Sequence, residues 1–170
     1  MSETQQKVPL RSRFNNVINA RDVPVEPYTQ EGGRYGGGAR EIAVAIGARD
    51  LGYSISFVDP GQRSCPYHFH HSEEEVFYVL EGRGLLRQGD GKSEEERIEL
   101  GPGDFISFPA GTGIAHQFIN PGDVPFVYLA MSNRIRSDVA EYPDSDKVNI
   151  RSTHTILRRS PTLDYYDREL

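Results

Sequence analysis

Short segments rich in β-branched and aromatic residues follow one another along most of this chain, and turns that contain glycine or proline separate them. Strand candidates spaced roughly 8–12 residues apart, with turn signals between them, are typical of a β-sandwich or barrel. The 17 glycines and 11 prolines also fit a turn-rich all-β chain better than a helical one. The predicted strands are 41–47, 53–59, 67–71, 75–81, 85–88, 97–100, 104–108, 115–119, 125–131 and, near the end, 148–159.

The segment 75–81 indicates how these strands pack. Its alternate residues are largely apolar on both faces, with Glu75 at its start. A strand that is covered on both faces lies inside a sandwich and not on its surface.

The length of 170 residues suits one domain with an arm at each end. We expect an N-terminal arm at 1–39 that closes with a flexible glycine-rich loop at 30–39, a barrel at 40–132 and a C-terminal arm at 133–170. Only 134–141 looks weakly helical. The apolar strand faces and the aromatic tail at 163–167 favour a homodimer across which the arms pack.

Charge and cysteine content exclude several classes of function. The net charge is −6, and no concentrated basic stripe is present, so nucleic acid is not an expected partner. Cys65 is the single cysteine and cannot form an intramolecular disulfide, which favours a reducing cytosol. The sequence also lacks a signal-peptide or membrane-spanning apolar run, so we expect a cytoplasmic protein without a membrane partner. We interpret Cys65 as a small, at least partly buried residue.

Four of the five histidines fall in two short clusters, and this pattern indicates a metal site. His68 and His70 point to one face of a strand because side chains at i and i+2 share a face. Together with Glu75 and His116 they form a mixed nitrogen and oxygen ligand set that leaves room for a substrate or water. The sequence identifies no catalytic acid or base.

Neighbouring residues compete for these roles. Glu73 and Glu74 are alternatives to Glu75, but the period-two pattern favours Glu75. His71 should point away from the metal face, and His154 fits a surface or interface position better than a ligand position. Barrel packing is the simplest role for the aromatic residues Phe77, Phe108, Phe118 and Tyr128. For Asn120 the simplest role is to fix the turn after its strand.

The first cluster resembles the first motif of the cupin superfamily, G-x5-H-x-H-x(3,4)-E-x6-G. The matching residues are Gly61, His68, His70, Glu75 and Gly82, with one residue more than usual between the first glycine and the first histidine.

The second cluster resembles the second cupin motif, G-x5-P-x-G-x2-H-x3-N. Its residues are Gly103, Pro109, Gly111, His116 and Asn120, with two additional residues before the histidine. Both motifs together cover about residues 40–132. The flanking segments 141–144 and 163–167 are similar to those of small single-domain bacterial cupins, some of which are described as sugar-phosphate isomerases.

The resemblance implies a double-stranded β-helix, the cupin jelly-roll barrel, with one divalent metal ion (Zn, Mn, Fe or Ni). The implied ligands are His68, His70, Glu75 and His116. It also implies a small-molecule ligand or substrate.

Three functions are compatible with such a centre. The first, which we favour, is a metal-dependent isomerase or lyase acting on a sugar, sugar phosphate or hydroxy acid. The second is an iron-dependent dioxygenase, although the carboxylate Glu75 is atypical of the thiol-dioxygenase branch. The third is a non-enzymatic cupin that binds a small ligand. A phosphorylated substrate needs cationic groups near the metal, and the candidates are Arg63, Arg83 and Arg87.

Overall fold

The computed structural model describes residues 10–14, 16–30 and 32–169, and it is almost entirely β-structure, which confirms the predicted all-β class. The first nine residues of the predicted N-terminal arm lie outside the described residues. The strands are β1 (Glu26–Thr29), β2 (Gly36–Arg40), β3 (Gly52–Val58), β4 (Phe69–His70), β5 (Glu75–Glu81), β6 (Gly84–Gly89), β7 (Glu96–Leu100), β8 (Phe105–Phe108), β9 (Ala115–Ile119), β10 (Phe126–Ser132), β11 (Val139–Tyr142), β12 (Lys147–Ile150) and β13 (Thr155–Arg158). The helices are α1 (Ile42–Ile46) and the short 3-10 turns Ala20–Asp22, Pro143–Ser145 and Arg151–Thr153.

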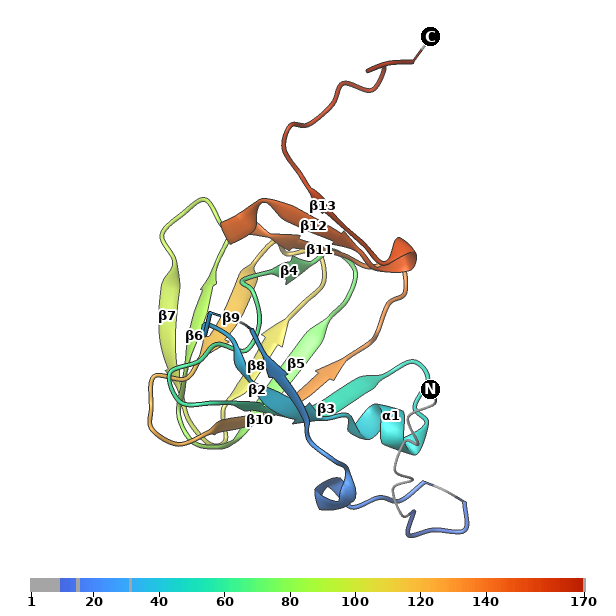
Figure 1. Ribbon diagram of the computed structural model, residues 1–170, viewed down its shortest axis with the longest axis vertical. Helices are drawn as coiled ribbons and strands as arrows, with labels where there is room; N and C mark the ends of the chain where they lie inside the picture. Colours follow the sequence, from blue (N-terminus) through green and yellow to red (C-terminus); the bar gives the residue numbers. More distant parts are fainter. Residues whose placement is uncertain (1–9, 15, 31, 170) are drawn as a thin grey trace.

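Two antiparallel sheets form the barrel (Figure 1). A six-stranded sheet has the order β1-β2-β3-β10-β5-β8, and a three-stranded sheet has the order β7-β6-β9. Their inner faces meet in one apolar core, because β5 contributes Phe77 and Val79, β9 contributes Phe118, and β6 contributes Leu86. The outer residues of β5 are only half-buried, so the strand covers the core with one face.

A third sheet, with the order β13-β12-β11-β4, lies across one end of the barrel (Figure 1). Its strand β11 pairs with the two-residue strand β4, in the register Ala140 with His70 and Glu141 with Phe69. The C-terminal segment is therefore joined by backbone hydrogen bonds to the strand that carries His70.

The predicted strand at 41–47 is wrong, because this segment forms the helix α1. Short apolar runs do not distinguish a strand from a buried helical turn by periodicity. The helix buries Ala43, exposes Val44, and ends at Gly47, whose left-handed backbone (φ 77°) lets its amide bond back to carbonyls of the helix.

The predicted flexible loop at 30–39 is also wrong in its second half, because Gly36–Arg40 is the strand β2. β2 lies between β1 and β3 in the six-stranded sheet. A Cβ atom at Gly37 would lie 1.9 Å from the carbonyl oxygen of Phe57, so glycine here allows a close backbone approach.

The weak helical prediction at 134–141 is wrong, since the described structure has no helix there and β11 begins at Val139. The predicted single strand at 148–159 is instead parts of β12 and β13, paired as a hairpin through Arg151–Thr153 and the left-handed residue His154.

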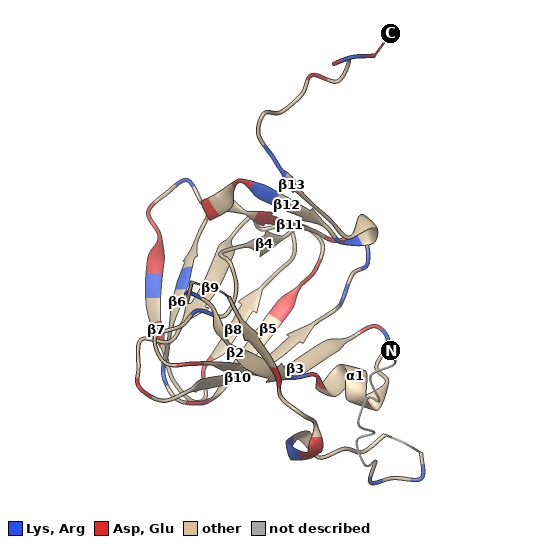
Figure 2. Cartoon of the chain, in the orientation of Figure 1, with Lys and Arg blue, Asp and Glu red and all other residues tan. Residues whose placement is uncertain are grey.

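The predicted division into two arms and a barrel remains a prediction, although strands of both arms pair with the barrel. The homodimer and the cytoplasmic location also remain predictions. Within the described residues, no helix has the length and apolar character that crossing a bilayer requires. Basic and acidic residues are interspersed over the described part of the chain (Figure 2).

Candidate metal centre

The two sequence motifs meet because His68 and His116 form a β-bridge. The amide of His116 donates to the carbonyl of His68 at 2.8 Å, and the reverse bond is 3.2 Å. The imidazole centroids lie 4.8 Å apart. The two additional residues before His116 are accommodated in the loop ahead of β9, and they do not displace this histidine from the site.

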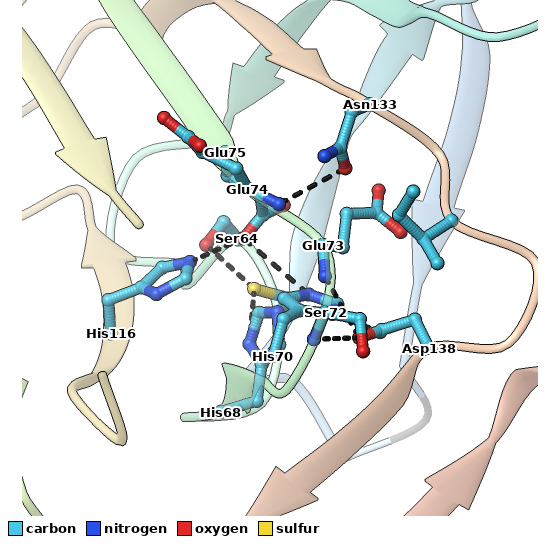
Figure 3. A network of polar contacts seen from close by, with 12 residues as sticks. Ser64, His68, His70, Ser72, Glu73, Glu74, Glu75, His116, Asn133 and Asp138 are labelled. Atoms are coloured by element: carbon cyan, nitrogen blue, oxygen red, sulfur yellow. Dashed lines mark hydrogen bonds and ion pairs between the residues drawn. The ribbon is translucent and has the colours of Figure 1, made fainter. Parts of the chain in front are cut away.

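His70 and Glu75 complete the group from β4 and from the start of β5 (Figure 3). One ligand atom each from His68, His70 and Glu75 lies within 4.8 Å of the others. The Nε2 atom of His116 lies 3.1 Å from Oε2 of Glu75, and Nε2 of His70 lies 3.5 Å from the same oxygen. The four residues predicted from the motifs therefore gather around the carboxylate of Glu75, although His116 contacts Glu75 from outside the three-residue group.

This convergence leaves a buried carboxylate oxygen without a hydrogen bond. Oε2 of Glu75 accepts none, because its contacts with the two imidazoles lack hydrogen-bond geometry. Buried polar atoms without a partner are rare in folded proteins, and an ion is one of the groups that satisfies them. The donor set thus fits a divalent cation, to which three imidazoles and one carboxylate are suitable ligands.

Two hydrogen bonds fix the tautomers of the first two histidines. Nδ1 of His68 lies 2.8 Å from the carbonyl oxygen of Pro66, and Nδ1 of His70 lies 2.5 Å from Oδ2 of Asp138. Both partners are acceptors, so Nδ1 of each ring carries a proton, and Nε2 is the nitrogen left to bind a metal once the ring is neutral. A lone pair on Nε2 is what a metal ligand requires.

The titration behaviour of the site reflects burial and mutual contact. Burial is the main reason that the pKa of His116 falls to about 4, which keeps this imidazole neutral. Burial raises the pKa of the Glu75 carboxyl, but the surrounding imidazoles, led by that of His116, outweigh it and the net shift is downward. Burial lowers the pKa of His68, but the sulfur of Cys65 and then the carboxylate of Glu75 raise it to about 9.

The candidate ligands line a cavity of about 370 Å³ between the barrel and the third sheet. Hydroxyl, thiol and amide side chains form much of the remaining wall, together with aromatic rings. These lining residues are Tyr28, Ser56, Ser64, Cys65, Phe77, Phe118, Tyr128, Tyr142 and Asn149. The charged groups are Glu73 and Asp138, both buried, and Arg151, which pairs with Glu73.

The residues that the sequence assigns to roles other than metal binding lie outside the candidate ligand group. His71 points out of the site, with Nε2 2.9 Å from Oε1 of Glu141, and His154 is exposed in a turn. Cys65 is partly buried beside His68. Asn120 is fully buried and holds the turn after β9, donating to carbonyls of Val58 and Val124. The four aromatic residues assigned to packing belong to the core.

The prediction that arginines at 63, 83 and 87 supply the anion site is not supported by their positions, because none of them lines the cavity. Arg87 is held by Glu95 and Asp144, and Nη1 of Arg63 donates to Gln117 at 3.4 Å. The arginine that does line the cavity is Arg151.

Asp138, Glu73 and Arg151 are the site residues that sequence reasoning does not find. Asp138 and Arg151 lie in the C-terminal segment, outside both motifs, and carry no local spacing signal. Glu73 is recognisable from the sequence only as a rival ligand, whereas its buried side chain pairs with Arg151 at the edge of the cavity.

Comparison with known proteins relates this chain to a family of known fold. A family profile described as "Cupin domain" matches residues 54–132. A solved structure from Acidithiobacillus ferrooxidans, provisionally described as a sugar phosphate isomerase, superposes with a TM-score of 0.79 over 90% of this chain and 98% of that one, at 26% identity. A second, described as a sugar phosphate isomerase of the cupin superfamily from Silicibacter pomeroyi, gives a TM-score of 0.67 over 77% and 82% of the two chains, also at 26% identity.

A curated relative, the glucose-6-phosphate isomerase of Thermococcus kodakarensis, is 29% identical over 89 residues, which are 48% of this chain and 46% of the relative. The match thus spans a little under half of that protein's length. The profile match, the two superpositions and the all-β barrel agree, and residues 54–132 of this chain are a cupin domain.

Proposed function

We propose that this protein is a metal-dependent cupin enzyme of the isomerase or lyase type, which moves a proton next to a carbonyl group of a small polyhydroxylated substrate. The observation that carries the proposal is the buried, unpartnered oxygen of Glu75 facing imidazole nitrogens at the wall of the cavity. Such an arrangement combines a cation site with space for a substrate.

His68, His70, Glu75 and His116 would hold the ion. A bound divalent cation supplies a Lewis acid that polarises a carbonyl oxygen and stabilises the negative charge that develops on it. Around it, three neutral imidazoles and one carboxylate leave a net charge near +1, which favours binding of an oxyanion.

The cavity wall would orient the substrate. Hydroxyl groups of Ser56, Ser64 and Tyr128 line it and can exchange hydrogen bonds with substrate hydroxyls. The carboxylate of Glu73 and the phenol of Tyr128 are the candidates in this wall to take up and return the proton. A volume of about 370 Å³ suits a small molecule.

A sugar phosphate is the second substrate candidate, and two observations favour it. The relatives named above are described as sugar phosphate and glucose-6-phosphate isomerases. Arg151 lies at the cavity and could meet a phosphate if it left Glu73. Because this arginine is paired, we place the unphosphorylated hydroxy-carbonyl compound first.

Incubation in D₂O tests the reaction type directly. The protein is purified without added metal, its metal content is measured, and the ion found is restored. Proton NMR then follows a panel of aldoses, ketoses and their phosphates for deuterium incorporation next to the carbonyl. Incorporation or isomer formation that requires the metal supports the proposal. If every compound of the panel shows neither incorporation nor isomer formation, the proposal is contradicted. Metal-dependent oxygen consumption by iron-loaded protein would assign the dioxygenase instead.

A further inference from the structure

Asp138 connects the candidate metal centre to the C-terminal segment. Its side chain is 2% exposed and lies immediately before β11, six residues beyond the end of the matched cupin domain at 132. Figure 3 shows it beside His70 and the backbone that leads from β4 to β5.

Both oxygens of this carboxylate are engaged on the metal side of the fold. Oδ2 accepts from Nδ1 of His70 at 2.5 Å. Oδ1 accepts from the backbone amides of Ser72 and Glu73, at 2.9 and 3.1 Å. One side chain therefore orients a histidine of β4 and also fixes the loop that delivers Glu75 at the start of β5.

We propose that Asp138 is a positioning residue of the metal centre: it holds His70 in the tautomer with the proton on Nδ1, so that Nε2 faces the cation. This inference rests on the proposed metal site. A carboxylate that accepts from the remote nitrogen of a ligand histidine fixes the ring and raises its basicity. The centre is then built from two parts of the chain, the cupin domain and the segment that follows it.

Replacement of Asp138 by asparagine separates this role from simple packing. An amide has nearly the same shape as a carboxylate, but it accepts at one end and donates at the other. If the oxygen introduced by Asp138→Asn keeps the two backbone amides, its NH₂ group faces Nδ1 of His70, which must then accept and so carry its proton on Nε2. A matched control exists in Glu141→Gln, which alters the pair between Glu141 and His71, a histidine outside the metal group.

The first measurement is the affinity for Co²⁺ by visible spectroscopy and calorimetry, using the full chain. We expect Asp138→Asn to bind Co²⁺ roughly 10- to 100-fold more weakly than the unaltered protein, with a changed ligand-field spectrum. Glu141→Gln should retain the affinity. Equal affinity and an equal spectrum for Asp138→Asn would overturn the role of Asp138, whereas failure of the unaltered protein to bind Co²⁺ would instead contradict the proposed metal site.

A second measurement needs no variant of Asp138 and therefore does not depend on its folding. Long-range ¹H–¹⁵N correlation NMR on the metal-free protein reports the tautomer of each imidazole, with the signals of His70 assigned by their loss in His70→Gln. We expect the proton of His70 on Nδ1. A proton on Nε2 would overturn the inference even if the protein binds metal.

Discussion

The imidazole of His116 lies flat against the ring of Phe108, with centroids 3.8 Å apart and planes inclined by only 10°. The two residues come from β9 and β8, on different sheets of the barrel. Phe108 thus packs against this candidate ligand histidine, while Glu75 faces the Nε2 atom of the histidine. The apolar core and the candidate metal centre therefore meet where these two rings stack.

Replacement of Phe108 by alanine should lower the free energy of unfolding by about 3–5 kcal/mol, as for other buried phenylalanines. Phe105 on the same strand provides a matched control, because it is 70% exposed whereas Phe108 is 7% exposed. We expect Phe105→Ala to change stability by less than about 0.5 kcal/mol. Urea denaturation of the metal-free variants measures both, and equal losses would contradict the alternation of burial along β8.

Asn120 should contribute to stability through its side-chain hydrogen bonds. Its amide donates to two carbonyls at 2.8 Å and its oxygen accepts from the amide of Gly122 at 3.0 Å. Asn120→Ala removes all three hydrogen bonds and leaves the buried carbonyl of Val58 without this donor, so the free energy of unfolding should fall by roughly 2–4 kcal/mol. Asn133→Ala removes a single hydrogen bond to the amide of Glu74 and should have an effect of about 1 kcal/mol or less. A similar melting temperature for both variants would contradict the stabilising role of the Asn120 side chain.

The metal-free protein should be most stable near pH 6.5. In the unfolded chain His116 binds a proton at its ordinary pKa of 6.5, whereas in the folded protein its pKa is about 4. The free energy of unfolding therefore falls as the pH drops from 6.5 to 4. Above pH 6.5 folded His68 keeps its proton up to about pH 9 and the unfolded chain does not, so stability falls again as the pH rises.

Urea midpoints at pH 4.5, 6.5 and 9 in the presence of a chelator measure this profile. His68→Gln should flatten its alkaline side and leave the acidic side in place. A midpoint that rises steadily from pH 6.5 to 9 in the unaltered protein would be inconsistent with the raised pKa of His68.

The strand pattern and the four candidate ligands could be predicted from sequence because local signals specify them. Segments 75–81 and 115–119 have the bounds of β5 and β9, since alternation of apolar residues and flanking turns is a local property. The i, i+2 spacing of His68 and His70 likewise indicates a shared face.

The remainder depends on contacts that sequence spacing does not encode. The glycines of β2 look like a loop, and only the approach of the Phe57 backbone explains them as a strand. Asp138 reaches His70 across 68 residues of chain, through the pairing of β11 with β4. The arginines predicted to bind a substrate anion do not line the cavity, for the same reason. The position of Arg87 in the sequence does not reveal that it pairs with Glu95 and Asp144.

Metal stoichiometry tests the central claim most directly. Equilibrium dialysis against Mn²⁺, Zn²⁺, Fe²⁺ or Ni²⁺, followed by elemental analysis, should give one ion per chain for the unaltered protein and for the control His71→Gln. Glu75→Gln should bind at least roughly tenfold more weakly, because it loses the only charged ligand of the group. At an ion concentration of about 100 times Kd, binding should also stabilise the unaltered fold by about 2.7 kcal/mol. An unaltered protein that retains none of these ions, or equal retention after Glu75→Gln, would contradict the account.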